Sequence, residues 1–363
     1  MKLGIIGLPS SGKTTLFNAL TMGNAPTGQS MGGRFDVVTA VVDVRDPRVD
    51  ILSEMFNPKK TTYARITYSD VAGLQRSEDE SSSTISPQVL NHIAGLDGFV
   101  HVVRAFENDL VPHLDGSVDA LRDLEALDTE FLLNDLGAVE RRIEKIDEGL
   151  KKGATKDKAA AQAELALFQR LLETLSAEQP LRTLDLTEDE LKTLRGYGLL
   201  TLKPKIVILN IGDDQDEITL DYDYPHTIVT NIRGRLEMEL AQLGAAGDTE
   251  SLEMFMDEYG VTELSLDKII RLSYDLMGLE SFFTVGEDEV RAWTIGRGAS
   301  AVEAAGAIHT DLAKGFIRAE VVAYDDLINL GGMAQARTAG KLRQEGKTYI
   351  VEDGDILHVK FNL

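Results

Sequence analysis

Short apolar runs bounded by turn residues recur along the amino-terminal two thirds of the chain. They cover residues 3–6, 98–103 and 205–209, with further β-rich stretches at 37–42 and 64–69. Apolar runs of this kind are typical of strands that are buried on both faces of a parallel sheet. The first run is followed at once by a helical pattern that contains Leu16, Phe17 and Leu20. This part of the chain therefore predicts an α/β fold.

A helical pattern lies between the runs at 98–103 and 205–209. One stripe of apolar residues, at spacings of four and three, comprises Leu132, Leu136, Val139, Ile143, Ile146 and Leu150. A second stripe comprises Leu165, Phe168, Leu172 and Leu175. Gly153-Ala154 separates them, which predicts an antiparallel, coiled-coil-like helical hairpin inserted into the α/β domain. Its charged outer face is most simply a solvated surface, and a partner-binding face is the alternative.

The last part of the chain, from Ser281, has a pattern of its own. Strand-like residues 290–295, an alanine-rich helix at 301–312 and strand-like residues 319–323 precede the closing segments 349–351 and 356–359. This order predicts a small α+β domain. A chain of 363 residues is long enough for two or three domains. We predict a nucleotide domain over 1–117 and 201–280, a helical insert over 118–200 and a tail domain over 281–363.

A phosphate-binding motif directly follows the first apolar run. It is the complete GxxxxGKT sequence Gly7-Leu8-Pro9-Ser10-Ser11-Gly12-Lys13-Thr14. The glycines let backbone N–H groups close around the β-phosphate, the lysine ammonium bridges β- and γ-oxygens, and the threonine hydroxyl ligates Mg²⁺. We predict nucleotide contacts from Pro9, Ser10, Ser11, Gly12, Lys13, Thr14 and Thr15, with Lys13 also catalytic. The alternative, a turn that merely contains Gly and Ser, does not explain the preceding strand and the following helix.

A second motif, Asp70-Val71-Ala72-Gly73, ends the strand-like stretch 64–69. It has the DxxG form of a GTPase switch, in which the aspartate holds Mg²⁺ through water and the glycine amide senses the γ-phosphate. A third candidate, Asn210-Ile211-Gly212-Asp213, follows the run 205–209 at the place of the base-reading loop. The usual sequence there is NKxD, and Ile211 stands in place of the lysine. Asp213 can accept from guanine, and ATP remains open.

Composition narrows the remaining choices. Hydrophobic residues make up 43% and charged residues 27% of the chain, as in globular proteins. No apolar stretch approaches the roughly 20 residues of a membrane span, and the short first run leaves no room for a signal peptide, so we expect a cytoplasmic protein without a membrane partner. There is no cysteine and the six histidines are scattered, so Mg²⁺ is the expected metal. A net charge of −23 argues against DNA binding, and an RNA or ribosomal partner needs a local basic patch.

These motifs resemble the YchF/Obg-like ATPase family over nearly the whole length. The resemblance is carried by the phosphate loop, Asp46-Pro47-Arg48, Asp70-Val71-Ala72-Gly73-Leu74, residues 102–109, residues 289–295, Ile308-His309-Thr310-Asp311, residues 314–319 and Phe361-Asn362. It implies a P-loop NTPase domain of Rossmann-like α/β fold, the inserted hairpin and a carboxy-terminal β-grasp TGS domain. It also implies slow triphosphate hydrolysis and association with ribosomes.

Three departures from the family pattern bear on mechanism. The family base loop is typically NxxE, linked to ATP, whereas this chain has Asn210 and Asp213. The first-switch threonine of a TIEPN-like segment is missing where residues 34–38 align, although Thr27 or Thr39 could replace it. The glycine-rich second switch is replaced by a shorter stretch from Gln75 to Ser86 that is rich in serine and acid. These differences predict altered switching.

Hydrolysis needs a group that orients water, and the residue after the DxxG motif is Leu74, which cannot. His113 is the candidate that the sequence offers, because a histidine titrates near neutral pH; a plain surface histidine is the alternative.

The leading hypothesis is therefore a Mg²⁺-dependent ATPase or GTPase that acts as a ribosome- or RNA-binding switch. One alternative is a nucleotide-sensing module with negligible hydrolysis, and another is a TGS domain that binds a protein or small ligand.

Overall fold

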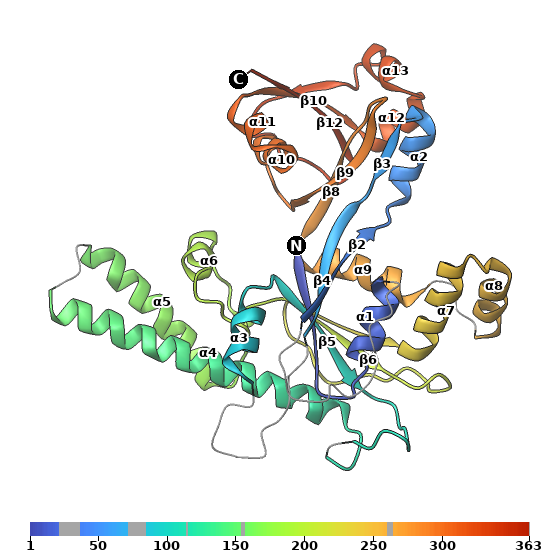
Figure 1. Cartoon of the computed structure of the whole chain (residues 1–363). Coiled ribbons are helices and arrows are strands. Elements are labelled where there is room, and N and C mark those ends of the chain that lie inside the picture. Colours follow the sequence, from blue (N-terminus) through green and yellow to red (C-terminus); the bar gives the residue numbers. More distant parts are fainter. Residues whose placement is uncertain (22–36, 72–84, 114, 154–156, 260–263, 363) are drawn as a thin grey trace. The chain divides into compact units, whose positions relative to one another are not determined.

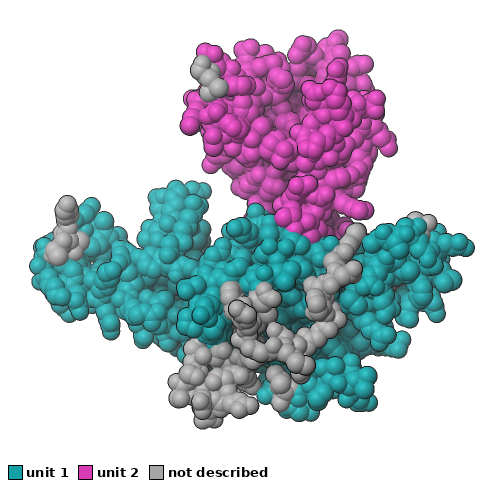
Figure 2. All heavy atoms as spheres, in the orientation of Figure 1, with its two compact units in different colours: residues 1–40, 67–266 teal, residues 41–66, 267–363 magenta. Residues whose placement is uncertain are grey.

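The computed structural model describes residues 1–21, 37–71, 85–113, 115–153, 157–259 and 264–362 (Figure 1). The chain forms two compact units, which Figure 2 shows in different colours. The first unit comprises residues 1–40 and 67–266, and the second comprises residues 41–66 and 267–363. The division therefore falls within two strands, β2 (Val37–Val44) and β4 (Ala64–Val71). The predicted three-domain division stays a prediction beside these two units.

The first unit is built on the predicted parallel sheet. Its strand order is β2-β4-β1-β5-β6-β7, in which β1 spans Lys2–Ile6, β5 Gly98–Arg104, β6 Lys205–Asn210 and β7 Thr227–Ile232. The pairs β1–β4, β1–β5, β5–β6 and β6–β7 are all parallel. Every residue of β5 and β6 is buried, as their unbroken apolar runs predict. The carboxyl ends of these strands therefore share one edge, which positions the loops that follow them.

The first unit also contains the helices that follow and flank these strands. They are α1 (Lys13–Thr21), α3 (Pro87–Ala94), α4 (Ala120–Lys151), α5 (Lys158–Ser176), η1 (Leu181–Thr183), α6 (Glu188–Leu194), α7 (Gly234–Ala246) and α8 (Thr249–Glu258). The two predicted stripes lie in α4 and α5, which form the long hairpin seen in Figure 1. The fold class predicted from the sequence is thus confirmed for this unit.

Helix α4 has two halves with different packing partners. Its amino-terminal half packs on the sheet, where Leu124 joins the cluster around Val207 and Phe131 the cluster around Phe99. Its carboxy-terminal half packs against α5 through Val139 and Phe168. On α5 the buried face is Leu167, Phe168, Leu171 and Leu175, so Leu165 and Leu172 of the predicted stripe are only partly buried. The apolar spacing therefore identifies the two helices. Which face of α4 is buried depends on its packing against the sheet and against α5.

Buried polar groups fix α4 to the base of the sheet. Lys205, at the start of β6, donates to Asp128 Oδ1 of α4 over 2.5 Å. Asp135, also on α4 and fully buried, accepts from the backbone N–H groups of Leu200 and Thr201 over 2.9 and 2.7 Å. Because unpaired groups of this kind are costly inside a protein, these bonds specify how α4 lies on the sheet.

The second unit holds a mixed sheet with the order β11-β10-β12-β8-β9-β3. Its strands are β8 (Leu279–Thr284), β9 (Glu289–Gly296), β10 (Phe316–Ala323), β11 (Arg343–Glu345), β12 (Asp355–Phe361) and β3 (Lys60–Thr62). The β8–β9 hairpin is antiparallel and β12 runs parallel to β8. This is the strand arrangement of a β-grasp sheet, as predicted for the tail.

The second unit contains more helices than the sequence predicts, and the one predicted helix is divided in two. They are α9 (Ser265–Leu276, whose first two residues fall in the first unit), α10 (Ala301–Ile308), α11 (Thr310–Lys314), α12 (Tyr324–Leu330) and α13 (Met333–Thr338), with α2 (Pro47–Phe56) from the early segment. The alanine-rich pattern predicted a single helix over 301–312. His309 instead ends α10 in an extended conformation, and its side chain accepts from Asp311 N to begin α11.

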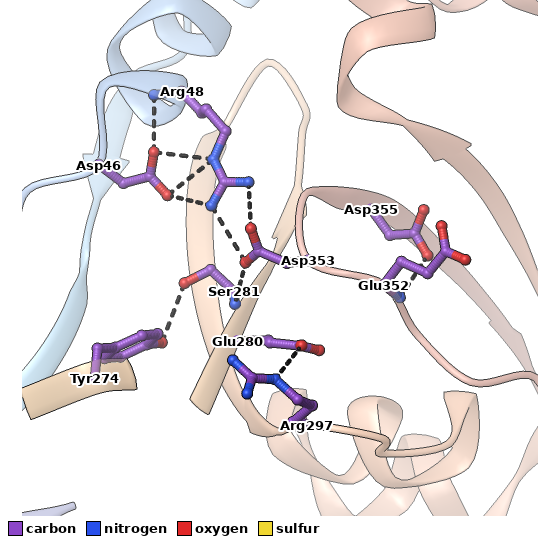
Figure 3. Close-up of polar contacts among 9 residues, drawn as sticks. All are labelled: Asp46, Arg48, Tyr274, Glu280, Ser281, Arg297, Glu352, Asp353 and Asp355. Carbon is purple, nitrogen blue, oxygen red and sulfur yellow. Dashed lines mark hydrogen bonds and ion pairs between the residues drawn. The ribbon is translucent and has the colours of Figure 1, made fainter. Parts of the chain in front are cut away.

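Residues 41–66 belong to the second unit, although residues 67–266 separate them in the sequence from its main segment, 267–363. Strand β3 pairs in parallel with β9, with Lys60 opposite Glu289. At the start of α2, Arg48 lies between Asp46 and Asp353 (Figure 3). Its Nη2 donates to Asp46 over 2.8 Å and its Nη1 to Asp353 over 2.7 Å. The guanidinium also lies over the ring of Phe283, so a single side chain ties α2 to β8 and to the turn before β12.

Candidate nucleotide-binding site

Residues 7–12 form a tight loop that connects β1 to α1. At two positions of this loop only glycine fits. Gly7 and Gly12 have φ angles of +147° and +99°. A Cβ atom on Gly7 would lie 2.2 Å from the carbonyl oxygen of Val102, and one on Gly12 would lie 2.2 Å from Asn210 Nδ2. The loop is therefore pressed against β5 and against the end of β6. Pro9 and Ser10 lie on it and Thr15 in the first turn of α1.

Lys13 begins α1, and its ammonium group folds back over this loop. The Nζ atom donates to the carbonyl oxygen of Leu8 over 2.8 Å. Burial of the ammonium lowers the pKa of Lys13 to about 8, and the nearby charge of Asp70 offsets this only in part. A cation that is stripped of water and close to backbone N–H groups is suited to bind phosphate oxygens.

Thr14 and Asp70, the two predicted metal residues, are in contact. Thr14 Oγ1 donates to Asp70 Oδ2 over 2.8 Å, and Asp70 is 8% exposed at the end of β4. The parallel pairing of β4 with β1, in which Asp70 lies opposite Ile5, brings the two motifs together. A hydroxyl and a carboxylate oxygen are ligands that Mg²⁺ prefers, so this pair fits the ion.

Asn210 is a structural link within the site. Its Nδ2 donates to the carbonyl oxygen of Ser11 over 2.9 Å, and its Oδ1 accepts from Gly234 N over 3.0 Å. The side chain is 5% exposed, so it connects the phosphate loop, the end of β6 and the start of α7 in the interior. A Cβ atom at position 234 would lie 2.8 Å from Asn210 Oδ1, so a larger residue there would displace the Asn210 side chain.

The other two predicted base-loop residues are placed differently. Ile211 is 4% exposed and belongs to the core cluster with Leu209 and Tyr222, so its side chain is core and only its backbone can face a nucleotide. Asp213 is partly exposed, and burial raises the pKa of its carboxyl group although Arg235 and the backbone N–H of Leu236 oppose this. Of these two side chains only that of Asp213 reaches the surface, and its carboxylate accepts from the backbone N–H of Leu236.

His113 follows a loop organised by Arg104, the last residue of β5. Arg104 donates through Nε to the carbonyl oxygen of Phe106 over 3.1 Å and through Nη2 to that of Val111 over 2.7 Å. His113 Nε2 lies 2.7 Å from Asp123 Oδ2, and its Nδ1 accepts from Asp115 N over 3.2 Å. The imidazole is thus held by the start of α4.

Several predicted residues fall outside the described part of the chain. They are Gly73, Leu74, Thr27, residues 34–36 of the first-switch alignment and residues 75–84 of the serine- and acid-rich stretch. Of the described switch residues, Thr39 is exposed on β2, and Ser86 caps α3 by accepting from Val89 N over 3.4 Å.

Sequence reasoning missed Asp123 as the partner of His113. The two residues are ten positions apart, and a carboxylate near the start of a helix is common in a chain with 60 Asp and Glu residues. The local sequence does not distinguish Asp123 from other acidic residues. Its contact with His113 arises only when the loop after β5 folds back onto the start of α4.

Comparison with known proteins identifies the family. A family described as 50S ribosome-binding GTPase matches residues 2–135, and YchF-GTPase_C, described as a protein of unknown function, matches residues 279–362. "Ribosome-binding ATPase YchF" of Bacillus subtilis (strain 168) is 39% identical over 370 residues, which cover 99% of each chain. The chain belongs to the YchF family.

Further YchF-family members agree with this result. "Obg-like ATPase 1" of Caenorhabditis elegans is 35% identical over 100% of this chain and 92% of its own. The solved structure of the Schizosaccharomyces pombe YchF GTPase superposes with a TM-score of 0.84 at 32% identity and covers 99% of this chain and 97% of that chain. Family membership and fold together place the chain among the P-loop nucleoside triphosphatases. Among the described residues, no helix combines the length and apolar character that crossing a bilayer requires.

Proposed function

We propose that this YchF-family chain is a Mg²⁺-dependent nucleoside triphosphatase that acts as a ribosome-binding switch. The contact between Thr14 and Asp70, 2.8 Å apart beside the Lys13 ammonium, carries the proposal. It brings a metal-binding hydroxyl, a metal-binding carboxylate and a phosphate-binding cation to one edge of the sheet. The relatives named ribosome-binding ATPase support the partner, and the proposal includes a cytoplasmic location because that is where such a partner is found.

In this site each residue has a defined task. Backbone N–H groups of the loop 7–12 surround the β-phosphate, and Lys13 neutralises charge on the β- and γ-phosphate oxygens. Thr14 and Asp70 would hold Mg²⁺, which when bound supplies charge neutralisation between the phosphates. Asn210 keeps the loop pressed against β6 through its bond to Ser11. Phosphoryl transfer of this type depends mostly on positioning and electrostatics, so this frame is where the rate acceleration originates.

For the base, we propose a preference for ATP over GTP. Reading guanine by the GTPase pattern uses an aspartate that accepts twice and a lysine packed along the loop. Here the lysine position is the core residue Ile211, and Asp213 already accepts a bond from Leu236 N. The relatives named ATPases agree with this choice. Equilibrium binding of Mg²⁺-ATP and Mg²⁺-GTP tests it, and tighter GTP binding would mean that Asp213 reads guanine without the lysine.

The decisive experiment measures phosphate release from ATP and GTP by the full chain and by Lys13→Ala. We expect slow turnover that exceeds the Lys13→Ala background and disappears when Mg²⁺ is chelated. Co-sedimentation with ribosomes, in ATP-analogue and ADP states, then tests the partner. Turnover no higher than that of Lys13→Ala would refute hydrolysis, and absence from the ribosome pellet in both states would refute the partner.

The engagement of both ring nitrogens of His113 favours a second candidate, a nucleotide-sensing module with negligible hydrolysis. Such a module would bind nucleotide and change its partner affinity without turnover. Tight nucleotide binding with turnover equal to that of Lys13→Ala would select it. If the chain does not bind ribosomes, the alternative is that its second unit binds a protein or a small ligand.

A further inference from the structure

The hydrogen bonds of His113 occupy both of its ring nitrogens. A carboxylate can only accept, so Nε2 carries the proton that is donated to Asp123 Oδ2 over 2.7 Å. Nδ1 accepts from the backbone N–H of Asp115 over 3.2 Å, so its lone pair is also used. A histidine that orients or deprotonates water needs a ring nitrogen that faces the water. In this arrangement His113 cannot perform the task for which it is the sequence candidate.

Asp123 is well suited to hold the ring in place. It lies in the first turn of α4, it is 4% exposed, and its second oxygen, Oδ1, accepts from Arg122 Nε and Nη2 over 3.0 and 2.8 Å. Arg122 in turn donates to the carbonyl oxygen of Ser117 over 2.8 Å. The carboxylate is thus fixed on both sides, and the side chain of His113 is only 9% exposed. Charge-assisted bonds of this kind are the stronger ones in proteins.

We propose that Asp123 is a positioning residue that restrains His113 in a resting position and limits nucleotide hydrolysis. The inference rests on the proposed triphosphatase function and on His113 as the group that orients water. Breaking the Nε2–Oδ2 bond frees the ring to turn away from α4. In this way Asp123, at the start of α4, limits the basal rate of nucleotide hydrolysis.

The test compares single-turnover hydrolysis of Mg²⁺-ATP by the wild type, Asp123→Ala, Asp123→Asn, His113→Ala and the double variant. We expect kcat to rise about tenfold in Asp123→Ala, a ratio that corresponds to about 1.4 kcal/mol, while the Kd for nucleotide stays within about twofold. Asp123→Asn keeps a neutral acceptor and should give a smaller rise. The double variant should be no faster than His113→Ala.

Glu125→Ala is the matched control, because it removes a carboxylate from an exposed position on the same turn region of α4. A comparable rise in Glu125→Ala would overturn the proposal, since the effect would then be one of net charge. An unchanged or lower kcat in Asp123→Ala with nucleotide affinity retained would overturn it, as would a rise that persists without His113.

A measurement that is independent of hydrolysis separates this inference from the proposed function. Nitrogen-15 NMR of the ring should show a slowly exchanging Nε2–H in the wild type that is lost in Asp123→Ala. If the NMR signal behaves so and no variant hydrolyses ATP, the triphosphatase proposal fails while the restraint on the ring stands. If the signal is absent from the wild type, the restraint itself is refuted.

Discussion

Raising the pH above 8 should weaken nucleotide binding, because Lys13 must then take up a proton to bind phosphate. In the nucleotide-free protein the Lys13 ammonium is buried against the Leu8 carbonyl, and this burial lowers the pKa of Lys13 to about 8. Triphosphate oxygens favour the charged form, so in the complex the pKa returns to its ordinary value of about 10.4 or above. The affinity is therefore full below pH 8 and decreases as the pH rises from 8 toward the pKa of the complex.

The size of the effect follows from the two pKa values. Between them, each pH unit reduces affinity by up to about tenfold, since one proton is bound with the nucleotide. From pH 7.5 to 9.5 the Kd should rise about 20-fold, equivalent to about 1.8 kcal/mol. The γ-phosphate does not contribute, because a phosphate with a pKa of about 6 is already ionised throughout this range.

Isothermal titration calorimetry with Mg²⁺-ATP at pH 7.5, 8.5 and 9.5 provides the measurement. Buffers of different ionisation enthalpy report proton uptake, which should approach one proton per nucleotide near pH 9. Lys13→Arg is the control, because a guanidinium stays charged over this range and should abolish the slope. A constant Kd with no proton uptake, or the same slope in Lys13→Arg, would refute the argument that burial sets the pKa of Lys13.

Three further predictions concern the frame around the site. Gly7→Ala should lower nucleotide affinity at least about 100-fold, because its Cβ would lie 2.2 Å from a β5 carbonyl oxygen; Gly95→Ala, with an ordinary contact at 3.5 Å, is the control in the same binding assay. Arg48→Ala should destabilise the second unit by about 2 kcal/mol through loss of its pairing with Asp353, and unchanged hydrogen exchange in α2 would contradict this. Asp135→Ala should cost about 3–5 kcal/mol in urea unfolding, because it strands buried backbone donors; a loss under about 1 kcal/mol would contradict this.

Sequence patterns specified those parts of the site that depend on neighbouring residues. The motif Gly7–Thr14 forms the turn after β1 and the first two residues of α1 as predicted, because its glycines and the flanking apolar runs define that turn locally. The motifs predict that Thr14 and Asp70 both hold the metal, and the parallel pairing of β1 with β4 brings the two residues together. The two hairpin helices were likewise evident from apolar spacing alone.

The same patterns did not specify which residues pack across long separations. The amino-terminal half of α4 belongs to the sheet, although its spacing resembles that of the half that packs on α5. Residues 41–66 join the second unit through the pairing of β3 with β9 and the bonds of Arg48. Neither arrangement could be predicted from the sequence. Apolar spacing indicates that one face of an element is buried, but it does not indicate which other element packs against that face.

The sequence by itself therefore determined the fold class, the phosphate loop and the family, and it singled out Thr14 and Asp70, which the structure brings into contact. These follow from local turn chemistry and short periodicities, which act between residues close in the chain. Only the tertiary structure decided that Asn210 braces the phosphate loop, that Ile211 is core, and that His113 is held by Asp123. Such contacts depend on how loops fold back and on which buried polar groups can be satisfied together, and that is a property of the packed molecule.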